Sequence, residues 1–323
     1  MRGKRFYGVV GVVAAVAALA VLAVTGSATA RTKASCGTVT LNEQAWTGST
    51  ANTYIAKYVL EKKLGCKVEI TKIAEIPVYQ AMTDGKVDAV LEDWQHVDQY
   101  AQYVTKQKTV VRAGPNGVTG VIGWYIPTYL MKQHPEFKTW KGLKGKETLF
   151  KSPESGSQGM FLGGDPSYVQ KDQELIEALG LNFKHVTAGA EPAQVARWSQ
   201  LYKQKKPVIF YWYTPQYLNS AYQLSEIKLP PRGKNCVDSY SPKLGKNWSI
   251  YRCGYGQTII EKLISSKFAK SGSPALNVIR KWHWTAADQN TVANQIAGKH
   301  VDPEKAAEAW VKANPAKVKA WLG

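Results

Sequence analysis

The first part of the chain after residue 37 alternates apolar strand patterns with amphipathic helix patterns. The apolar positions predict strands at 38–46, 67–73 and 87–94, with helices at 50–64 and 78–84 between them. Gly65 and Gly85 follow the two helices and are expected to end them. The third strand, VDAVLEDW, is apolar on both faces along most of its length, as in a buried parallel sheet. The pattern therefore predicts a βαβαβ start.

A second α/β unit follows, and it is less regular. Its pattern predicts strands at 117–127, 183–188 and 207–213, helices at 127–134, 170–179 and 192–203, and a loop at 152–159. From Tyr217 onward the chain is irregular and rich in Pro and Gly, and it then gives an apolar strand around 255–263. The chain ends in helices, the last of which begins at Asp302-Pro303, a capping residue followed by proline.

This order of elements favours an α/β fold of two lobes between which the chain crosses twice. We expect residues 31–118 to form the first part of lobe I, residues 119–216 lobe II, and residues 217–323 the part that returns to lobe I. The sequence has no internal repeat, heptad pattern or low-complexity tract.

The N-terminal segment predicts a secretory signal peptide at residues 1–30. Basic residues precede an apolar run from Gly8 to Val24, and the small residues Ala28-Thr29-Ala30 form a cleavage site. A membrane anchor is the alternative, but the run is shorter than the roughly 20 residues that a spanning helix needs. Lipid attachment at Cys36 is a further alternative, which the basic residues just before it disfavour. An extracytoplasmic protein is expected.

The four cysteines suit the oxidising compartment that a signal peptide implies. Cys36 and Cys66 each precede a predicted strand, and a right-handed βαβ unit places both strand starts at the same sheet edge. We therefore predict the disulfides Cys36–Cys66 and Cys236–Cys253. With no C-x-x-C and only five histidines, we expect no metal site.

The net charge of +18 comes from lysines scattered along the chain, which favours solvated helix faces over one basic arm for nucleic acid. The chain has no nucleophile elbow, phosphate-binding loop or H-E-x-x-H motif, so we expect neither an enzyme nor a cofactor. The notable residues are aromatics at strand ends: Trp46, Trp94 and Tyr211-Trp212-Tyr213. Ligands of open α/β sheets lie beyond the carboxyl ends of strands, and converging aromatic faces attract a quaternary ammonium by cation–π interaction. Most of the other tryptophans are expected in cores.

Three segments, LNEQAWTGSTANTYIAKYVLEKKLGCKVEI, YQAMTDGKVDAVLEDWQHVDQY and KKPVIFYWYTPQYLN, resemble the glycine betaine, proline betaine and choline binding proteins of ABC importers. The resemblance runs through nearly the whole chain after the signal peptide. It implies a type II periplasmic-binding-protein fold, in which two lobes close like a hinge on a ligand cleft. It also implies a permease and an ATPase as partners, and we expect a monomer.

The resemblance implies roles for particular residues. Trp94, Tyr213 and Trp46 match the family's aromatic cage, with a tyrosine where the family has tryptophan at 213, and Trp212 is expected to help. The loop that binds the ligand's carboxylate resembles residues 154–158, so backbone amides near Gly156 and Ser157 are expected to hold the polar end.

Two departures from the family pattern favour choline or another cation over glycine betaine as the ligand. The family's histidine position falls on Asp98 or Gln99, while His96 lies two residues after Trp94, and the carboxylate loop contains Glu154. Glu43 and His96 are further candidates for ligand contact, because an acid beside a buried cation is favourable. Carnitine or a polyamine remains an alternative ligand, and a secreted enzyme or an envelope adhesin an alternative class of protein.

Overall fold

The computed structural model describes residue 1, residues 3–8 and residues 36–323. The chain divides into a short unit, Met1–Lys33, and a compact unit, Ala34–Gly323. The predicted signal peptide falls on the short unit, most of which lies outside the described residues. In the part of the chain that the structure describes, no helix has the length and apolar character needed to cross a membrane.

The compact unit is a mixed α/β structure. Its strands are β1 (Thr38–Asn42), β2 (Lys67–Thr71), β3 (Ala89–Asp93), β4 (Val110–Pro127), β5 (Gly159–Gly163), β6 (Phe183–Thr187), β7 (Ile209–Thr214), β8 (Leu224–Ile227) and β9 (Gln257–Ser265). Its helices are α1 (Thr47–Val59), α2 (Val78–Thr83), α3 (Val97–Gln99), α4 (Thr128–Gln133), α5 (Asp172–Leu179), α6 (Glu191–Lys203), α7 (Trp248–Tyr251), α8 (Pro274–Lys281), α9 (Ala286–Ala293), α10 (Pro303–Ala313) and α11 (Pro315–Leu322). Segments of π-helix continue α1, α3 and α9 at Leu60–Leu64, Tyr100–Lys106 and Asn294–Gly298.

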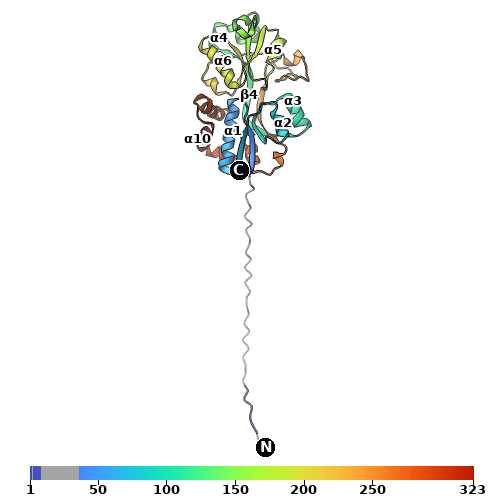
Figure 1. Ribbon diagram of the computed structural model, residues 1–323, viewed down its shortest axis with the longest axis vertical. Coiled ribbons are helices and arrows are strands. Elements are labelled where there is room, and N and C mark those ends of the chain that lie inside the picture. The colour runs from blue at the N-terminus through green and yellow to red at the C-terminus, as the bar shows by residue number, and fades with distance from the viewer. Residues whose placement is uncertain (2, 9–35) are drawn as a thin grey trace. The chain divides into compact units, whose positions relative to one another are not determined.

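One long strand, β4, connects two groups of parallel strands. The order in the sheet is β2-β1-β3-β9-β4-β7-β5-β6, with β8 also paired to β4. The first part of β4 pairs with β9, and its second part pairs with β7 and β8. In Figure 1, α1, α2, α3 and α10 surround one end of β4, and α4, α5 and α6 surround the other. The predicted α/β fold of two lobes is confirmed.

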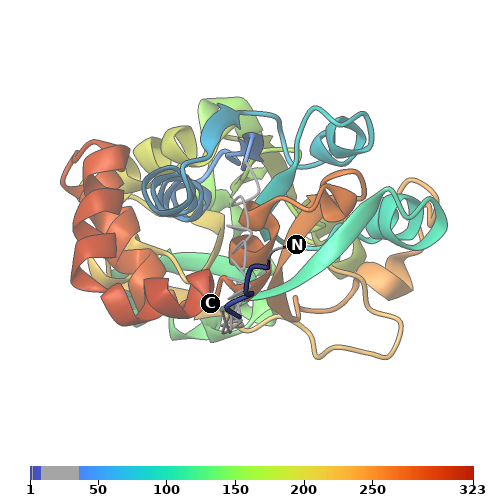
Figure 2. The ribbon, with the colours of Figure 1, turned by 90° about the horizontal axis from the view of Figure 1, so that it is seen from below.

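We call the part around β1, β2 and β3 the first lobe, and the part around β5, β6 and β7 the second lobe. Both contain parallel strands with crossover helices, as the apolar patterns predict. The C-terminal helix α10 packs beside α1 in the first lobe, which Figure 2 shows from below. The exact residue boundaries of the lobes stay a prediction.

The pairing of β4 with β9 is interrupted twice. Register shifts occur between Arg112 and Gly114 and between Pro115 and Thr119. Gly117, inside the second interruption, has φ +100°, and a Cβ there would overlap the backbone oxygen of Trp284. Glycine is therefore required at this position both by its backbone angle and by the close packing.

Local sequence signals end and begin the helices as predicted. Gly65 has φ +73° after the π-helical continuation of α1, and Gly85 has φ +75° just beyond α2. At the start of α10, the Asp302 carboxylate accepts hydrogen bonds from the backbone N–H groups of Glu304 and Lys305, at 3.0 and 3.1 Å. This cap satisfies two N–H groups that the first helical turn leaves without partners.

Both predicted disulfides are confirmed. Cys36–Cys66 joins the chain just before β1 and β2, whose first residues pair in the sheet, and Cys236–Cys253 closes part of the irregular segment after β8. The second disulfide lies beside the buried ammonium of Lys171, whose Nζ is 3.4 and 3.3 Å from the two sulfur atoms. Burial lowers the pKa of Lys171 to about 8.

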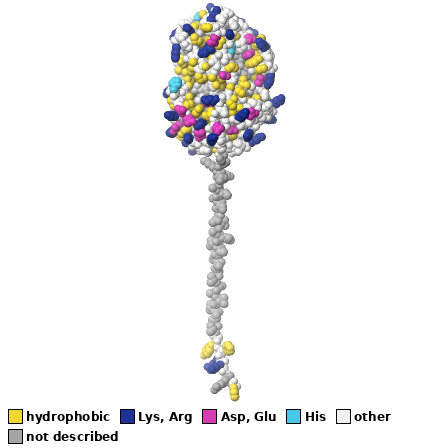
Figure 3. Space-filling model, viewed as in Figure 1, with side chains coloured by type: hydrophobic (Ala, Val, Ile, Leu, Met, Phe, Trp, Pro, Cys, Tyr) yellow, Lys and Arg dark blue, Asp and Glu magenta, His cyan; other side chains and the backbone are white. Residues whose placement is uncertain are grey.

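Most tryptophans predicted to lie in cores do so. Trp282, Trp284, Trp310 and Trp321 contact one another among the C-terminal helices, in two stacked and two edge-to-face pairs. Trp124 and Trp198 are fully buried in the second lobe. Lysine and arginine side chains are spread over the visible face of the compact unit in Figure 3, in keeping with the scattered charge of the sequence.

Candidate functional site

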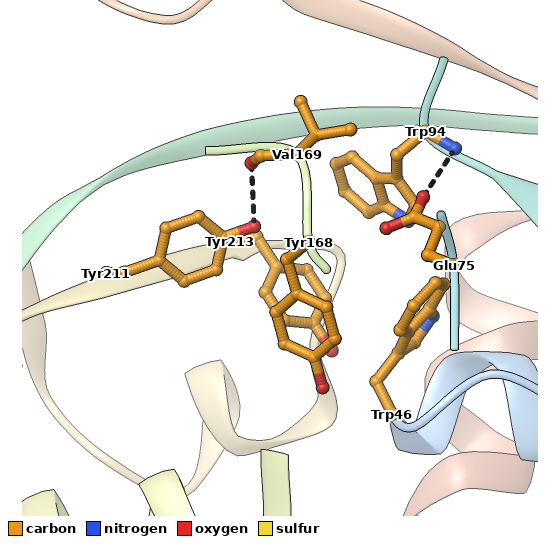
Figure 4. Close-up of a pocket in the computed structure, with 7 residues that line it drawn as sticks. All are labelled: Trp46, Glu75, Trp94, Tyr168, Val169, Tyr211 and Tyr213. Atoms are coloured by element: carbon orange, nitrogen blue, oxygen red, sulfur yellow. Dashed lines mark hydrogen bonds between the residues drawn. The ribbon is translucent and has the colours of Figure 1, made fainter. Parts of the chain in front are cut away.

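An aromatic pocket lies where the two lobes meet. Its free volume is about 10 Å³, far below the roughly 300 to 1,000 Å³ typical of ligand pockets, because its own side chains nearly fill it. The residues that line it are Trp46, Glu75, Trp94, Tyr168, Val169, Tyr211 and Tyr213, drawn in Figure 4. They follow or occupy the carboxyl ends of β1, β2, β3, β5 and β7. This is the edge where open α/β sheets bind ligands.

The rings of the pocket meet in pairs that join the two lobes. Trp94 and Tyr213 contact each other edge to face, with centroids 5.4 Å apart and planes at 81°. Trp46 and Tyr168 do the same at 5.4 Å and 88°. Gly120 of β4 lies under Trp94, and any Cβ there would overlap the indole ring. We call the rings of Trp46, Trp94, Tyr168 and Tyr213 the aromatic cage.

A buried carboxylate fixes the two tryptophans of the cage. Oε1 of Glu92 accepts hydrogen bonds from Nε1 of Trp46 at 2.7 Å and from Nε1 of Trp94 at 3.2 Å. Its other oxygen accepts from Nδ2 of Asn52 at 2.8 Å. Burial raises the pKa of Glu92 to about 7, although the two indole donors favour the ionised form. Glu92 thereby links the polar edges of both rings.

A second carboxylate connects the cage to the opposite lobe. Glu191, at the start of α6 in the second lobe, accepts a hydrogen bond from the hydroxyl of Tyr213. Its Oε1 also accepts from the backbone N–H and the hydroxyl of Thr47, at 3.0 and 2.7 Å. Thr47 begins α1 in the first lobe, where the helix dipole favours a negative charge. Burial, followed by the Glu191 charge, raises the pKa of Tyr213 far above its usual range, so its hydroxyl stays a donor.

The polar side of the pocket consists of Glu75 and its partner His96. Glu75 is 1% exposed, and its Oε2 lies 3.3 Å from Nε2 of His96. The same nitrogen lies 2.8 Å from the backbone oxygen of Ser167 in the second lobe. Burial lowers the pKa of His96, but Glu75, Asp93 and the backbone oxygen of Ser167 together raise it more, so the net shift is upward. Burial, followed by the charge of Glu75, also raises the pKa of neighbouring Asp93 to about 7.

The structure brings together some of the residues singled out by sequence and separates others. Trp46, Trp94 and Tyr213 meet in the pocket, and His96 reaches it through Glu75. Trp212 lies on the opposite face of β7, since successive strand residues point to opposite faces. Its ring packs on Trp198, and its Nε1 donates to Oδ1 of Asn219 at 2.7 Å.

Four other candidate residues lie outside the pocket. Glu43 accepts from the hydroxyl of Thr50 and pairs with Lys72 at 3.2 Å, and Asp98 accepts from the hydroxyl of Ser241 at 2.9 Å. The loop with Gly156 and Ser157 precedes β5 and so lies at the amino end of that strand. The pocket lies at the carboxyl ends of the strands, and the loop after β5 contributes Tyr168 and Val169 instead.

The sequence analysis missed Glu75, Tyr168 and Val169 as lining residues, and it noted Tyr211 without giving it a role in the cage. The period of two in β7 could have found Tyr211, because it shares a face with Tyr213. The apolar run GMFLG at 159–163 is β5, which the sequence pattern did not predict, and recognising it would have pointed to the loop that follows. Nothing in the segment around Glu75 marks it, because a single acid after a strand is common.

Comparison with known proteins gives a family and several similar structures. The family described as the substrate binding domain of ABC-type glycine betaine transport systems matches residues 37–313. The glycine betaine/carnitine transport binding protein GbuC of Listeria monocytogenes is 29% identical over 120 residues, which are 37% of this chain and 33% of GbuC. That match therefore spans about a third of the relative's length.

Among solved structures, a choline binding protein of an ABC transporter in complex with choline has a TM-score of 0.70 and 20% identity, covering 89% of this chain and 92% of that one. Lactococcal OpuAC in its closed form with glycine betaine has a TM-score of 0.66 and 20% identity, with coverage of 89% and 100%. The glycine betaine and L-proline binding protein ProX of Borrelia burgdorferi has a TM-score of 0.71 and 18% identity, with coverage of 88% and 97%.

These solved structures share the two-lobed fold of this chain, and at such identities they show the fold alone. The family match covers well over half of the sequence and agrees with the resemblance noted in its three segments. The protein therefore belongs to the family of substrate-binding domains of ABC-type glycine betaine transport systems.

Proposed function

We propose that the protein captures a small quaternary-ammonium compound of the glycine betaine or choline type in the aromatic cage and delivers it to an ABC-type importer. The observation that carries this proposal is the convergence of Trp46, Trp94, Tyr168 and Tyr213 in one pocket between the lobes. A quaternary ammonium has no N–H to satisfy and is attracted to aromatic faces by about 0.5 to 2 kcal/mol per ring, depending on desolvation.

The way in which the rings are held supports a binding role. The indole N–H groups of Trp46 and Trp94 are satisfied by Glu92, and the hydroxyl of Tyr213 by Glu191. The polar edges are thus bonded to the protein, which leaves the apolar faces for a ligand that needs no hydrogen bond at its cationic end. The buried carboxylates next to the rings add attraction for a cation in a site of low polarity.

The remaining parts of the proposal follow from the family. The protein acts outside the cytoplasm, its partners are the permease and ATPase subunits of the importer, and it works as a monomer without catalysing a reaction. Closure of the two lobes on the ligand presents a surface that the permease recognises. Related proteins named for carnitine as well as glycine betaine keep carnitine among the ligands to be tested.

Calorimetric titration of the purified protein with glycine betaine, proline betaine, choline, carnitine and a polyamine tests this proposal. We expect saturable binding of at least one quaternary ammonium and its loss in Trp94→Ala, which removes a cage ring. Trp248→Ala is the control, because Trp248 is a partly exposed tryptophan of α7 outside the pocket. Binding of the polyamine alone, or equal binding by Trp94→Ala, would overturn the proposal.

A further inference from the structure

Glu75 provides the one charge among the seven residues that line the pocket. Six of the seven are aromatic or aliphatic, and no lysine or arginine is among them. The Glu75 carboxylate is 1% exposed, and a charge so far from water interacts strongly with any charge placed beside it. The affinity of a ligand therefore depends on the sign of the charge that it places on this side of the pocket.

Glu75 retains hydrogen-bonding capacity for a ligand. Its Oε1 accepts from the backbone N–H of Trp94 at 3.4 Å, which is a long contact. Its Oε2 faces Nε2 of His96 at 3.3 Å, but that nitrogen is nearer to the backbone oxygen of Ser167, at 2.8 Å. An ionised carboxylate offers about four acceptor positions and no donor. Glu75 can therefore accept from a ligand hydroxyl and has nothing to donate to a ligand carboxylate.

The groups around the pocket include further acids, which add negative charge where they are ionised. Glu92 and Glu191 accept hydrogen bonds from cage residues, and the charge of Asp93 interacts with those of Glu75 and His96. Among the described residues, His96 is the one group paired with Glu75 that carries positive charge when protonated, and its charge interacts with two carboxylates, those of Glu75 and Asp93. A ligand carboxylate placed beside Glu75 would meet repulsion that one histidine does not balance.

Resting on the proposed function, we infer that Glu75 makes this pocket selective for quaternary ammonium alcohols of the choline type over carboxylate-bearing betaines. The cage holds the trimethylammonium head, and Glu75 accepts the hydrogen bond of the ligand hydroxyl. Choline and glycine betaine share that head and differ at the other end, where one has a hydroxyl and the other a carboxylate. Glu75 therefore acts on the part of the ligand by which the two differ.

Titration of the purified protein with choline, glycine betaine and tetramethylammonium tests the inference. We expect choline to bind about 10 to 100 times more tightly than glycine betaine, as fits a charge-assisted hydrogen bond and the absence of repulsion. Glu75→Gln should reduce this preference at least about tenfold, because the amide is neutral and can donate to a carboxylate. Glu69→Gln, an exposed acid of β2 paired with Lys67, is the matched control and should keep the preference.

A choline analogue tests the same contact without changing the protein. The methyl ether of choline keeps the trimethylammonium head and lacks the hydroxyl donor, so we expect it to bind about tenfold more weakly than choline. Circular dichroism and a thermal melt of Glu75→Gln establish that the variant is folded. If it is not folded, the comparison of choline with its methyl ether decides the case.

The outcomes separate this inference from the proposed function. Glycine betaine that binds as tightly as choline, or a methyl ether that binds equally well, would overturn the inference and leave the aromatic cage in place. An unchanged preference in folded Glu75→Gln would also overturn it. Absence of binding for choline, glycine betaine and tetramethylammonium together would instead overturn the proposed function.

Discussion

The indole N–H of Trp46 donates a 2.7 Å hydrogen bond to Oε1 of Glu92, the same oxygen to which Trp94 donates at 3.2 Å. Two rings that come from different strand ends are thus held by one atom. Their relative orientation depends on a carboxylate that does not itself line the pocket. Glu92 is therefore a positioning residue for the cage.

Glu92→Ala is expected to weaken binding of the quaternary ammonium at least about tenfold. The change leaves two buried indole N–H groups, those of Trp46 and Trp94, without their acceptor, and each such loss costs about 1 to 3 kcal/mol. Glu92→Gln keeps a carbonyl oxygen as an acceptor and should lose less affinity, which distinguishes positioning from general destabilisation. Calorimetric titration of both variants measures the effect, with Glu61→Ala as control, a partly exposed acid in the π-helical continuation of α1. Equal affinity in Glu92→Ala and the unmodified protein would contradict the role.

Stability is expected to fall as the pH rises from about 5 to about 8. Burial raises the pKa values of Glu92 and Asp93 to about 7 and that of Asp172 to about 6, so between their unfolded and folded pKa values the folded protein binds more protons than the unfolded chain. A raised pKa contributes stability that is lost as the pH rises through it. Denaturant unfolding at pH 5, 6, 7 and 8 should show a decrease of more than about 1 kcal/mol. An increase over this range would be the contrary result.

The affinity for choline should rise with pH, whereas the stability falls. Choline keeps its charge at every pH, so a gain in affinity on going from pH 6 to pH 8 reports ionisation of protein groups next to the cage. Glu92 is the first of these, because its folded pKa lies at about 7 and its carboxylate holds two of the rings. Titrations at pH 6, 7 and 8 should show this gain in the unmodified protein and a smaller one in Glu92→Gln. The same pH dependence in both proteins would exclude Glu92 as its source.

Glu191→Ala is expected to speed ligand release. It removes the acceptor that links Tyr213 of the second lobe to Thr47 at the start of α1 in the first lobe. Loss of charge-assisted hydrogen bonds of about 1.5 to 3 kcal/mol should raise the dissociation rate about tenfold or more. Stopped-flow tryptophan fluorescence measures the rate. Glu177→Ala serves as control and should leave the rate unchanged. Glu177 is a partly exposed residue of α5 that pairs with Lys246.

Replacing Cys36 and Cys66 by serine should lower the free energy of unfolding by about 2 to 4 kcal/mol, because the unfolded chain regains the freedom of a closed loop. The two cysteines are 30 residues apart and lie at the strand starts, away from the strand ends that form the cage. Choline affinity at 25 °C should therefore stay within about twofold of the unmodified value. Urea unfolding and calorimetry measure the two quantities, and a large loss of affinity in a folded variant would contradict this expectation.

Much of the fold and part of the site could be predicted from sequence, and the differences have physical reasons. Trp46, Trp94 and Tyr213 were predicted because they follow or end strands with clear patterns, and the disulfides because both cysteines of the first pair precede paired strands. Glu75 could not be predicted, because its importance arises from burial beside His96 and from the absence of other charges in the lining.

The loop between Glu154 and Gln158 was predicted to bind the ligand because the strand that follows it, β5, was not recognised. β5 has only five residues, begins and ends in glycine, and gives no clear alternation, so its direction was not part of the prediction. Without it, the polar loop before the strand looked like the ligand loop. Knowing the strand would have placed that loop at the amino end, and Tyr168 at the edge where the other strand ends meet.

The 18-residue strand β4 limits how the two lobes can rotate relative to each other when the pocket opens or closes. Both lobes contain part of β4, so a relative rotation of the lobes must twist this strand. Between Pro115 and Thr119 the ladder with β9 is already interrupted, and the backbone at Gly117 turns in a way that other residues rarely adopt. Torsion taken up there would break few interstrand hydrogen bonds, and each lobe would turn as a rigid body.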